Sequence, residues 1–358
     1  MSEIHQIFVF EVAHSIDLAK AEGVLGGGTA RHAFRHRGRS TAFLRLEPAP
    51  LRISQERRPV ALERWRTEPV VDVVLYDFGA ATVAYQIPVA DGLDEMQVAS
   101  AALRRDDTLR ADAQELARNL LQSLAPAISR PSLLDFSEDY TIIGVRDLPT
   151  GVSAIDYCEH HAGEIARILR PLAGPLSEDE VRNATETRIS FGPRDVTIVD
   201  WEAAFVLDAE PEDVRAVLEF ANVQLLEMRW LDLQLDNALH RSYALLARGV
   251  GWRLRLPQFR SADDVSVVAE LQLEGAVMLE RVSNAIKVFG EEYLTRIYRL
   301  AAMRFQLAGL EGTITSKLAT VESIYQKMSD RASTLRLEAL EWIVIILIAL
   351  EIVLSFIR

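Results

Sequence analysis

The sequence predicts an α+β fold: a ferredoxin-like α/β sandwich first, then a mainly helical unit ending in a long C-terminal helix that enters a membrane. Three observations predict it. Strand and helix patterns alternate up to about residue 150, helical periodicity dominates afterwards, and residues 342–357 are almost wholly apolar. With 358 residues, 49% of them apolar and 25% charged, the chain is long enough for two packed units.

Residues 1–150 show the element order β-α-β-β-α-β, which is typical of a ferredoxin-like sandwich. An apolar run over 6–12 predicts the first strand, and Ser15 is placed to cap a short helix over 16–22. An arginine-rich insertion over 29–66 follows. The remaining elements are two strands joined by a hairpin at 78–80, two helices and a last strand, predicted over 70–77, 81–88, 93–103, 111–124 and 140–145.

Residues 151–310 predict a mainly helical domain that contains one β-hairpin near 187–199. The hairpin turn is indicated by the sequence Gly-Pro-Arg-Asp, which separates two short β-branched runs. Helical patterns are separated by proline and glycine breakers, and they cover 153–169, 212–248, 262–289 and 291–307.

From residue 314 onward, apolar side chains recur at alternating steps of four and three, without glycine or proline, which predicts one long helix with a continuous seam. We interpret 311–341 as a coiled-coil-like stalk that joins copies of the chain. The seam positions are Leu318, Val321, Tyr325, Met328 and Leu335. An equally open alternative is that this stripe packs on neighbouring helices of the same chain.

Residues 342–357 predict a transmembrane anchor. Trp342 stands where an interfacial aromatic is expected, Ile346 lies within the apolar run, and Arg358 follows it. Glu351 opposes insertion by about 2.5–3.5 kcal/mol at mid-bilayer, whereas each Ile, Leu or Val favours it by roughly 0.3–0.6 kcal/mol. The competing interpretation is a helix buried in the core of a soluble assembly.

The remaining composition points to a cytoplasmic body. Cys158 is a lone cysteine, so no intrachain disulfide forms and a reducing compartment is expected. Glu3 stands where a signal peptide needs bases. We therefore expect a single-pass protein of a bacterial inner membrane with most of the chain in the cytoplasm.

Positive charge is concentrated in one segment. Between residues 31 and 66, ten arginines face three glutamates, giving +7 in a chain whose net charge is −13, so the remainder carries −20. Because arginine forms bidentate contacts with phosphate, this segment is the candidate binding site for RNA, a ribosome or lipid head groups. The candidate anion-binding residues are Arg31, Arg35, Arg37, Arg39, Arg57 and Arg58. The alternative is a surface that only balances acidic neighbours.

The sequence contains no recognisable catalytic constellation, and no cofactor or metal is predicted. Cys158, His160, His161 and Glu164 are metal-ligand types, but on a helix the pairs i, i+3 and i, i+4 point in different directions. A solvated helix face explains them better.

The terminal segment Leu340–Ile352, with its embedded Glu351, resembles the end of the family named for being required for meiotic nuclear division, which includes bacterial YagE-type proteins and is also called domain of unknown function 155. Three internal segments, 74–79, 225–229 and 293–298, and two residue pairs, 304–305 and 324–325, carry the same resemblance. The resemblance implies a membrane anchor, homo-oligomers and, in a mitochondrial branch, support of translation. It defines no catalytic residues.

These observations favour a membrane-anchored, self-assembling scaffold or adaptor that tethers an anionic partner. The alternative is a membrane-associated enzyme acting on a phosphate-bearing substrate and using the arginines to hold it.

Overall fold

The computed structural model describes residues 2–25, 29–31, 48–131, 136–148, 151–172, 174–248, 273, 276–277 and 292–357. It describes the backbone alone for residues 29–31, 241–242, 244–248, 325, 328–329, 331–340 and 349–357. The chain forms two compact units, which we call the sheet unit (Met1–Arg229 with Arg281–Ala308) and the helical unit (Trp230–Glu280 with Gly309–Arg358).

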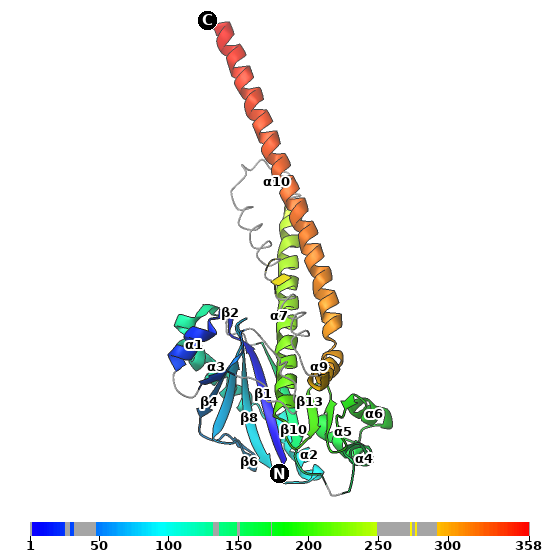
Figure 1. Cartoon of the computed structure of the whole chain (residues 1–358). Helices are drawn as coiled ribbons and strands as arrows, with labels where there is room; N and C mark the ends of the chain where they lie inside the picture. Colours follow the sequence, from blue (N-terminus) through cyan, green and yellow to red (C-terminus); the bar gives the residue numbers. More distant parts are fainter. Residues whose placement is uncertain are drawn as a thin grey trace. The chain divides into compact units, whose positions relative to one another are not determined.

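A nine-stranded mixed sheet forms the centre of the sheet unit, in the order β11-β12-β13-β10-β1-β8-β7-β4-β3 (Figure 1). Strand β1 pairs antiparallel with both β8 and β10, whereas β10 and β13 are parallel. The strands are β1 (Ser2–Glu11), β3 (Thr29–Arg31), β4 (Leu51–Glu56), β7 (Val70–Leu75), β8 (Ala80–Val89), β10 (Ser137–Val145), β11 (Arg188–Ile189), β12 (Val196–Val199) and β13 (Ala203–Leu207). Two short ribbons pair β2 (Ala13–Ile16) with β9 (Ile128–Pro131) and β5 (Ala61–Leu62) with β6 (Trp65–Arg66).

The α+β class is therefore confirmed, with a sheet larger than the four-stranded unit that the sequence predicted. Strands β10, β1, β8 and β7 are neighbours within it. The arginine-rich insertion extends the same sheet, because β4 pairs with β7 and β3 pairs with β4. Three strands after residue 150 also join it, including β13, which is buried throughout and which the sequence patterns missed.

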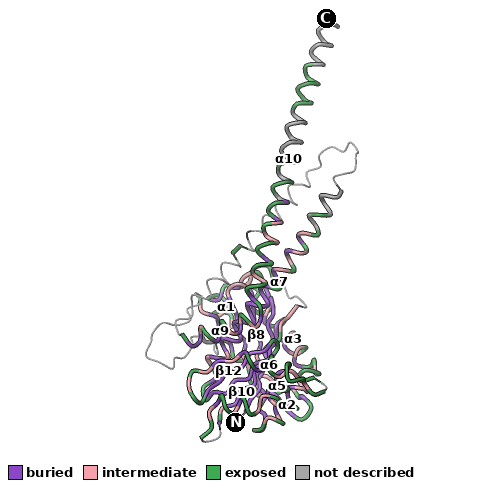
Figure 2. Tube along the Cα trace, turned by 90° about the vertical axis from the view of Figure 1, so that its right-hand side faces the viewer, coloured by how far each residue is buried: buried purple, intermediate pink, exposed green. Residues whose placement is uncertain are grey.

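The two faces of the sheet differ in chemistry. On one face Ile4, Phe8 and Phe10 of β1 join a continuous apolar core with α2 (Leu93–Arg105), α3 (Thr108–Ser123) and α5 (Ala162–Leu169). Alternation along β1 turns His5 and Glu3 to the other face. There His5 contacts Arg215 of α7 (Glu212–Arg248). Further along the sheet, α9 (Glu292–Arg304) contacts β11 and β12. Figure 2 shows the buried residues gathered in these strands and in the first part of α7.

The hairpin between β7 and β8 is the turn predicted at residues 78–80. Gly79 adopts a positive φ of 104°, and a Cβ there would lie 1.7 Å from the carbonyl oxygen of Ala13. The same glycine's own carbonyl accepts the backbone N–H groups of Val12 and Ala13. Glycine is therefore required both for the turn and for the close approach of the end of β1.

Two local predictions were wrong. Ser15 does not cap a helix, because it lies in β2 and its hydroxyl contacts that of Ser129 at 2.8 Å. Helix α1 (Leu18–Leu25) begins later, where the Asp17 side chain accepts the N–H of Lys20. The helix predicted over 153–169 is two helices, α4 (Ala154–His160) and α5, which meet at His161. Helix α6 (Glu178–Thr185) follows them.

In the helical unit, the later part of α7 packs beside α10 (Leu307–Ile357). Lys317 lies 2.7 Å from a carboxylate oxygen of both Asp232 and Asp236. Ile314 and Val321 of α10 are fully buried, and so is Leu235 of α7. The predicted long helix is thus present, although it begins at Leu307. The helix predicted over 262–289 lies almost wholly outside the described residues.

Candidate functional site

A group of charged side chains lies between the sheet and α7, within the sheet unit. We call it the ionic layer and define it as Glu3, His5, Arg52, Asp72, Arg215 and Glu219. The first four come from β1, β4 and β7, and the last two stand one helical turn apart on α7. Such a layer is unusual because buried charges are costly unless they are paired.

His5 forms the centre of the layer. Its Nε2 lies 3.2 Å from the carboxylate of Glu3, and Nη1 of Arg215 lies 3.1 Å from its Nδ1. Because a guanidinium only donates and a carboxylate only accepts, Nε2 carries the ring proton and Nδ1 accepts from Arg215. Burial lowers the pKa of His5, so the ring is neutral at pH 7.

The acid beside His5 stays ionised. The hydrogen bond from His5 is the main cause that lowers the pKa of Glu3 to about 2, and Arg146 adds to it at 2.9 Å. Gln86 donates a further hydrogen bond to Glu3 at 2.7 Å. Gly144 lies opposite Glu3 in the sheet, and a Cβ at that position would be in ordinary van der Waals contact with Glu3 Cγ, at 3.4 Å.

Arg52 and Asp72 form the second part of the layer. Their side chains are 2.6 Å apart, and Ser54 donates to the other carboxylate oxygen of Asp72 at 2.8 Å. Burial acts to raise the pKa of Asp72, but the charge of Arg52 and these hydrogen bonds outweigh it, so the pKa is lowered. This pair is therefore ionised on both sides.

Glu219 is the most deeply buried acid of the layer. Thr82 of β8 donates a hydrogen bond to its carboxyl group. Burial nevertheless raises the pKa of Glu219, and Arg52 and Arg215 only partly offset that effect. Tyr76 is buried close by, and burial followed by the charge of Glu219 raises its pKa. The ionic layer therefore contains ionised carboxylates, Glu3 and Asp72, together with a carboxyl group whose pKa is raised, Glu219, all in the neighbourhood of arginines.

The ionic layer was not predicted from the sequence, although the sequence contains a signal for it. Strand β1 carries Glu3 and His5 at alternate positions on either side of Ile4, and α7 has charged residues at Arg215 and Glu219 with helical spacing. Alternation places the first pair on one face of a strand and the i, i+4 spacing places the second pair on one face of a helix. That the two faces meet could not be read from either pattern.

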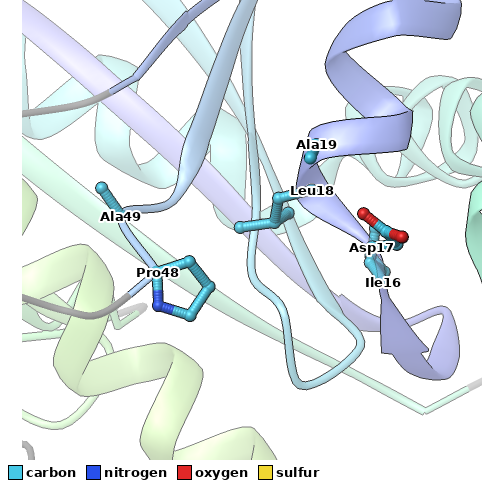
Figure 3. Close-up of a pocket in the computed structure, with 6 residues that line it drawn as sticks. All are labelled: Ile16, Asp17, Leu18, Ala19, Pro48 and Ala49. Carbon is cyan, nitrogen blue, oxygen red and sulfur yellow. The ribbon is translucent and has the colours of Figure 1, made fainter.

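A shallow cavity of about 460 Å³ opens elsewhere in the sheet unit (Figure 3). Its walls come from the start of α1 and from the residues before β4, namely Ile16, Asp17, Leu18, Ala19, Pro48 and Ala49. Figure 3 shows Leu18 projecting toward Pro48. The one charged group, Asp17, already caps α1 and pairs with Lys20 at 3.0 Å, so the walls offer a ligand mainly apolar contact.

The predicted anion-binding arginines fall mostly outside this description. Arg35, Arg37 and Arg39 lie outside the described residues, and of Arg31 only the backbone in β3 is described. Arg58 is exposed. Arg57 is half-buried and lies 3.1 Å from Asp112, a carboxylate that also accepts the hydroxyl of Tyr85 at 2.6 Å. Arg57 is thus committed to an ion pair.

Among the predicted membrane and seam residues, some have described side chains and others do not. Trp342 and Ile346 are strongly exposed on α10, whereas the side chain of Glu351 and the whole of Arg358 lie outside the described residues. Within the part of the chain that the structure describes, no helix is long and apolar enough to cross a membrane. Of the seam positions, Val321 is buried and Leu318 half-buried, and the side chains of Tyr325, Met328 and Leu335 are outside the description.

The metal-ligand types near residue 160 are separated by the break between α4 and α5. Cys158 is buried in the apolar core, and burial raises the pKa of its thiol to about 12. His161 instead contacts Glu164 through its Nδ1. Among the residues that the structure describes, no group of three or more metal-ligand side chains converges.

The fold and the ionic layer define an α+β protein whose mixed sheet carries a buried ionic layer beneath one helix. The chain belongs to the family described as uncharacterized protein MJ0711, N-terminal domain, whose model matches residues 1–213. It is similar to the uncharacterized protein MJ0711 of Methanocaldococcus jannaschii, with 18% identity over 243 residues that cover 67% of this chain and 73% of that protein. No solved structure matches.

These comparisons support an uncharacterized family, but not the meiotic nuclear division family that the sequence resembled. The match and the resemblance depend on different segments. The family model covers residues 1–213, including the arginine-rich segment, whereas the resemblance was strongest toward the C-terminal end. The matched region contains all of the ionic layer except its two α7 residues, Arg215 and Glu219, which follow directly.

Proposed function

We propose that the protein is a self-assembling scaffold tethered to a membrane by the end of α10. The observation that carries this proposal is the run Trp342–Ile348, seven consecutive large apolar residues that are each 48% to 64% exposed (Figure 2). Exposed apolar patches of this kind mark contact sites with lipid or protein.

The distribution of these residues around the helix favours lipid. Successive helical residues are rotated by about 100°, so the run Trp342–Ile348 covers every side of α10. A coiled coil needs one apolar stripe, whereas a helix that is apolar all round belongs in a bilayer or in the interior of a large assembly. The sequence continues in the same way to residue 357, interrupted only by Glu351 and Ser355.

Self-assembly is the second part of the proposal. Ile314 and Val321 are already buried within the helical unit, so these positions serve the packing of one chain. The half-buried Leu318 and the later seam positions are therefore the ones that we assign to contacts between copies. The predicted anionic partner stays part of the proposal through Arg31, Arg35, Arg37, Arg39 and Arg58 together with Arg57, although the ion pair of Arg57 with Asp112 makes it the weakest member.

A second function, an enzyme acting on a phosphate-bearing substrate, is supported by a different observation. The ionic layer places arginines beside a neutral histidine and a carboxyl group whose pKa is raised, which are the group types that bind phosphate and transfer protons. An assay for phosphatase or phosphodiesterase activity that is lost in His5→Gln would favour this function.

The test of the tether compares membrane and soluble fractions after lysis without detergent. We expect the intact chain in the membrane fraction and the double variant Ile345→Lys with Leu347→Lys in the soluble fraction. The double variant Glu311→Gln with Glu322→Gln changes the net charge of α10 by the same amount at polar positions, and it should stay with the membrane. An intact chain that is already soluble would contradict the proposal.

A further inference from the structure

Arg215 differs from two neighbouring arginines, Arg52 of the ionic layer and Arg146 beside it. Its hydrogen-bond partners among the described residues are the two ring nitrogens of His5, at 3.1 and 3.2 Å, and no carboxylate oxygen of these residues lies within ion-pair distance of it. Arg52 and Arg146, by contrast, pair with Asp72 and with Glu3, at 2.6 and 2.9 Å. Among the described residues, the guanidinium of Arg215 is therefore held in place by His5 and without a direct ion pair.

The remaining donors of Arg215 are not completely enclosed by the described residues. Only Nη1 makes a hydrogen bond to the described residues, which leaves Nε and Nη2 with unused donors. Neither nitrogen is among the fully buried polar atoms that lack a partner, so neither is sealed inside the protein. The residue as a whole is partly exposed. Unused donors at a water-accessible position are available to a ligand.

The surroundings of Arg215 also call for negative charge. Burial and then the nearby charge of Arg52 lower the pKa of Arg215, which shows that two guanidinium groups repel each other here. The charges of Glu219, Asp72 and Glu3 only partly offset this effect, and burial raises the pKa of Glu219 toward the neutral form. With Glu3 and Asp72 already paired, an anion from solution would supply the missing charge.

We propose that Arg215 and Arg52 bind a phosphoryl oxyanion in the ionic layer, with His5 as the residue that positions Arg215. Its Nδ1 accepts from Nη1 and so fixes one side of the planar guanidinium fork, leaving the other side for two oxygens of one anion. A tetrahedral oxyanion with several acceptor oxygens suits two arginines better than a halide does. Inorganic phosphate, a phosphomonoester and a lipid head group share this chemistry.

The test measures the phosphate-induced increase in melting temperature of the full chain in neutral detergent, at constant ionic strength, with calorimetric titration of inorganic phosphate for the affinity. A ligand that binds only the folded state raises the melting temperature. We expect an increase in the wild type and a loss of affinity of about tenfold or more in Arg215→Gln, because charge-assisted hydrogen bonds are removed. Arg215→Lys keeps the charge but not the fork, and it should bind more weakly than the wild type.

Arg146→Gln is the matched control, because its guanidinium is already paired with Glu3 and Glu212. Its starting melting temperature can fall, but the increment caused by phosphate should equal that of the wild type. An absent increment in the wild type, or equal increments in the wild type and in both Arg215 variants, would overturn the proposal.

A parallel arm uses vesicles of phosphatidylglycerol in phosphatidylcholine, and compares wild type with Arg215→Gln. Weaker binding of the variant to these vesicles, with no effect of free phosphate on either protein, would assign the oxyanion to a lipid head group. A free-phosphate effect with equal vesicle binding would assign it to a soluble ligand. No dependence on Arg215 in either arm would leave the proposal without support and refute it.

Discussion

Glu11 on β1 and Glu227 on α7 are two neighbouring acids inside the sheet unit whose carboxyl groups interact electrostatically, and each residue is only 3% exposed. Burial, followed by the charge of Glu227, raises the pKa of Glu11 well above 4.5. Two ionised carboxylates cannot both be accommodated here, so the pair retains a proton to higher pH than an exposed glutamate does.

This pair predicts a loss of stability as the pH rises. Below about pH 4.5 both the folded and the unfolded chain hold the proton, so the pair contributes no pH dependence. Above that value the unfolded chain releases the proton first, and the free energy of unfolding falls by up to about 1.4 kcal/mol per pH unit until the folded-state pKa is passed. Urea unfolding at a series of pH values should show this slope, and Glu11→Gln should reduce it.

Glu56→Gln provides the control for that experiment, because Glu56 is exposed at the end of β4. Its unfolding midpoint should follow the pH dependence of the wild type. If Glu11→Gln and the wild type gave parallel curves between pH 5 and pH 8, the carboxyl pair would not be the cause of the slope.

Asp200 predicts a large loss of stability on substitution. It lies between β12 and β13 with 2% of its side chain exposed, and it accepts hydrogen bonds from Arg170 at 2.6 and 2.9 Å and from Arg304. Asp200→Asn would leave the buried guanidinium group of Arg304 without its anion and Arg170 with Glu180 alone. We expect a loss of about 3–5 kcal/mol in the free energy of unfolding, measured by urea titration.

The exposed pair of Asp179 and Arg182 is the comparison for Asp200, because both side chains are largely in solvent. Asp179→Asn should leave the unfolding midpoint unchanged. A similar midpoint for both variants would mean that the Asp200 cluster adds nothing to stability.

Gly79→Ala should destabilise the sheet unit by about 1–3 kcal/mol or more, because alanine is strained at a φ of 104° and its Cβ would meet the Ala13 carbonyl. Gly163→Ala is its counterpart within α5, where a Cβ meets nothing within 4 Å. That variant should be neutral or more stable by up to about 1 kcal/mol. Thermal unfolding of both variants measures this difference in stability, and equal melting temperatures would exclude a special role for Gly79.

The seam of α10 predicts two different outcomes for neighbouring positions. Val321→Asp places a charge in the interior of the helical unit and should reduce helix content in circular dichroism. Leu318→Glu, at a half-buried position, should keep the helix content but lower the mass measured by light scattering. An unchanged mass with intact helices would assign the whole stripe to packing within one chain.

The sequence was most informative where a pattern is local. The β7–β8 hairpin, helices α2 and α3, the helix after Pro211 and the uninterrupted α10 all follow from periodicity, turn residues and breakers. The sequence was least informative about which strands pair with one another in the sheet. Arg52 was counted with an insertion, yet it lies in β4 and pairs with Asp72 of β7. The strand β13 is short and apolar, and periodicity alone does not distinguish such a run from part of a helix.

By itself the sequence determined the α+β class, the long apolar-ended helix and the concentration of arginine, because these depend on composition and on spacing along the chain. Only the tertiary structure decided that His5 of β1 meets Arg215 of α7, residues separated by more than half of the chain. Strand alternation and helical spacing each fix which face a side chain occupies. Which two faces pack together depends on the summed burial of the whole sheet unit, and no local pattern contains that information.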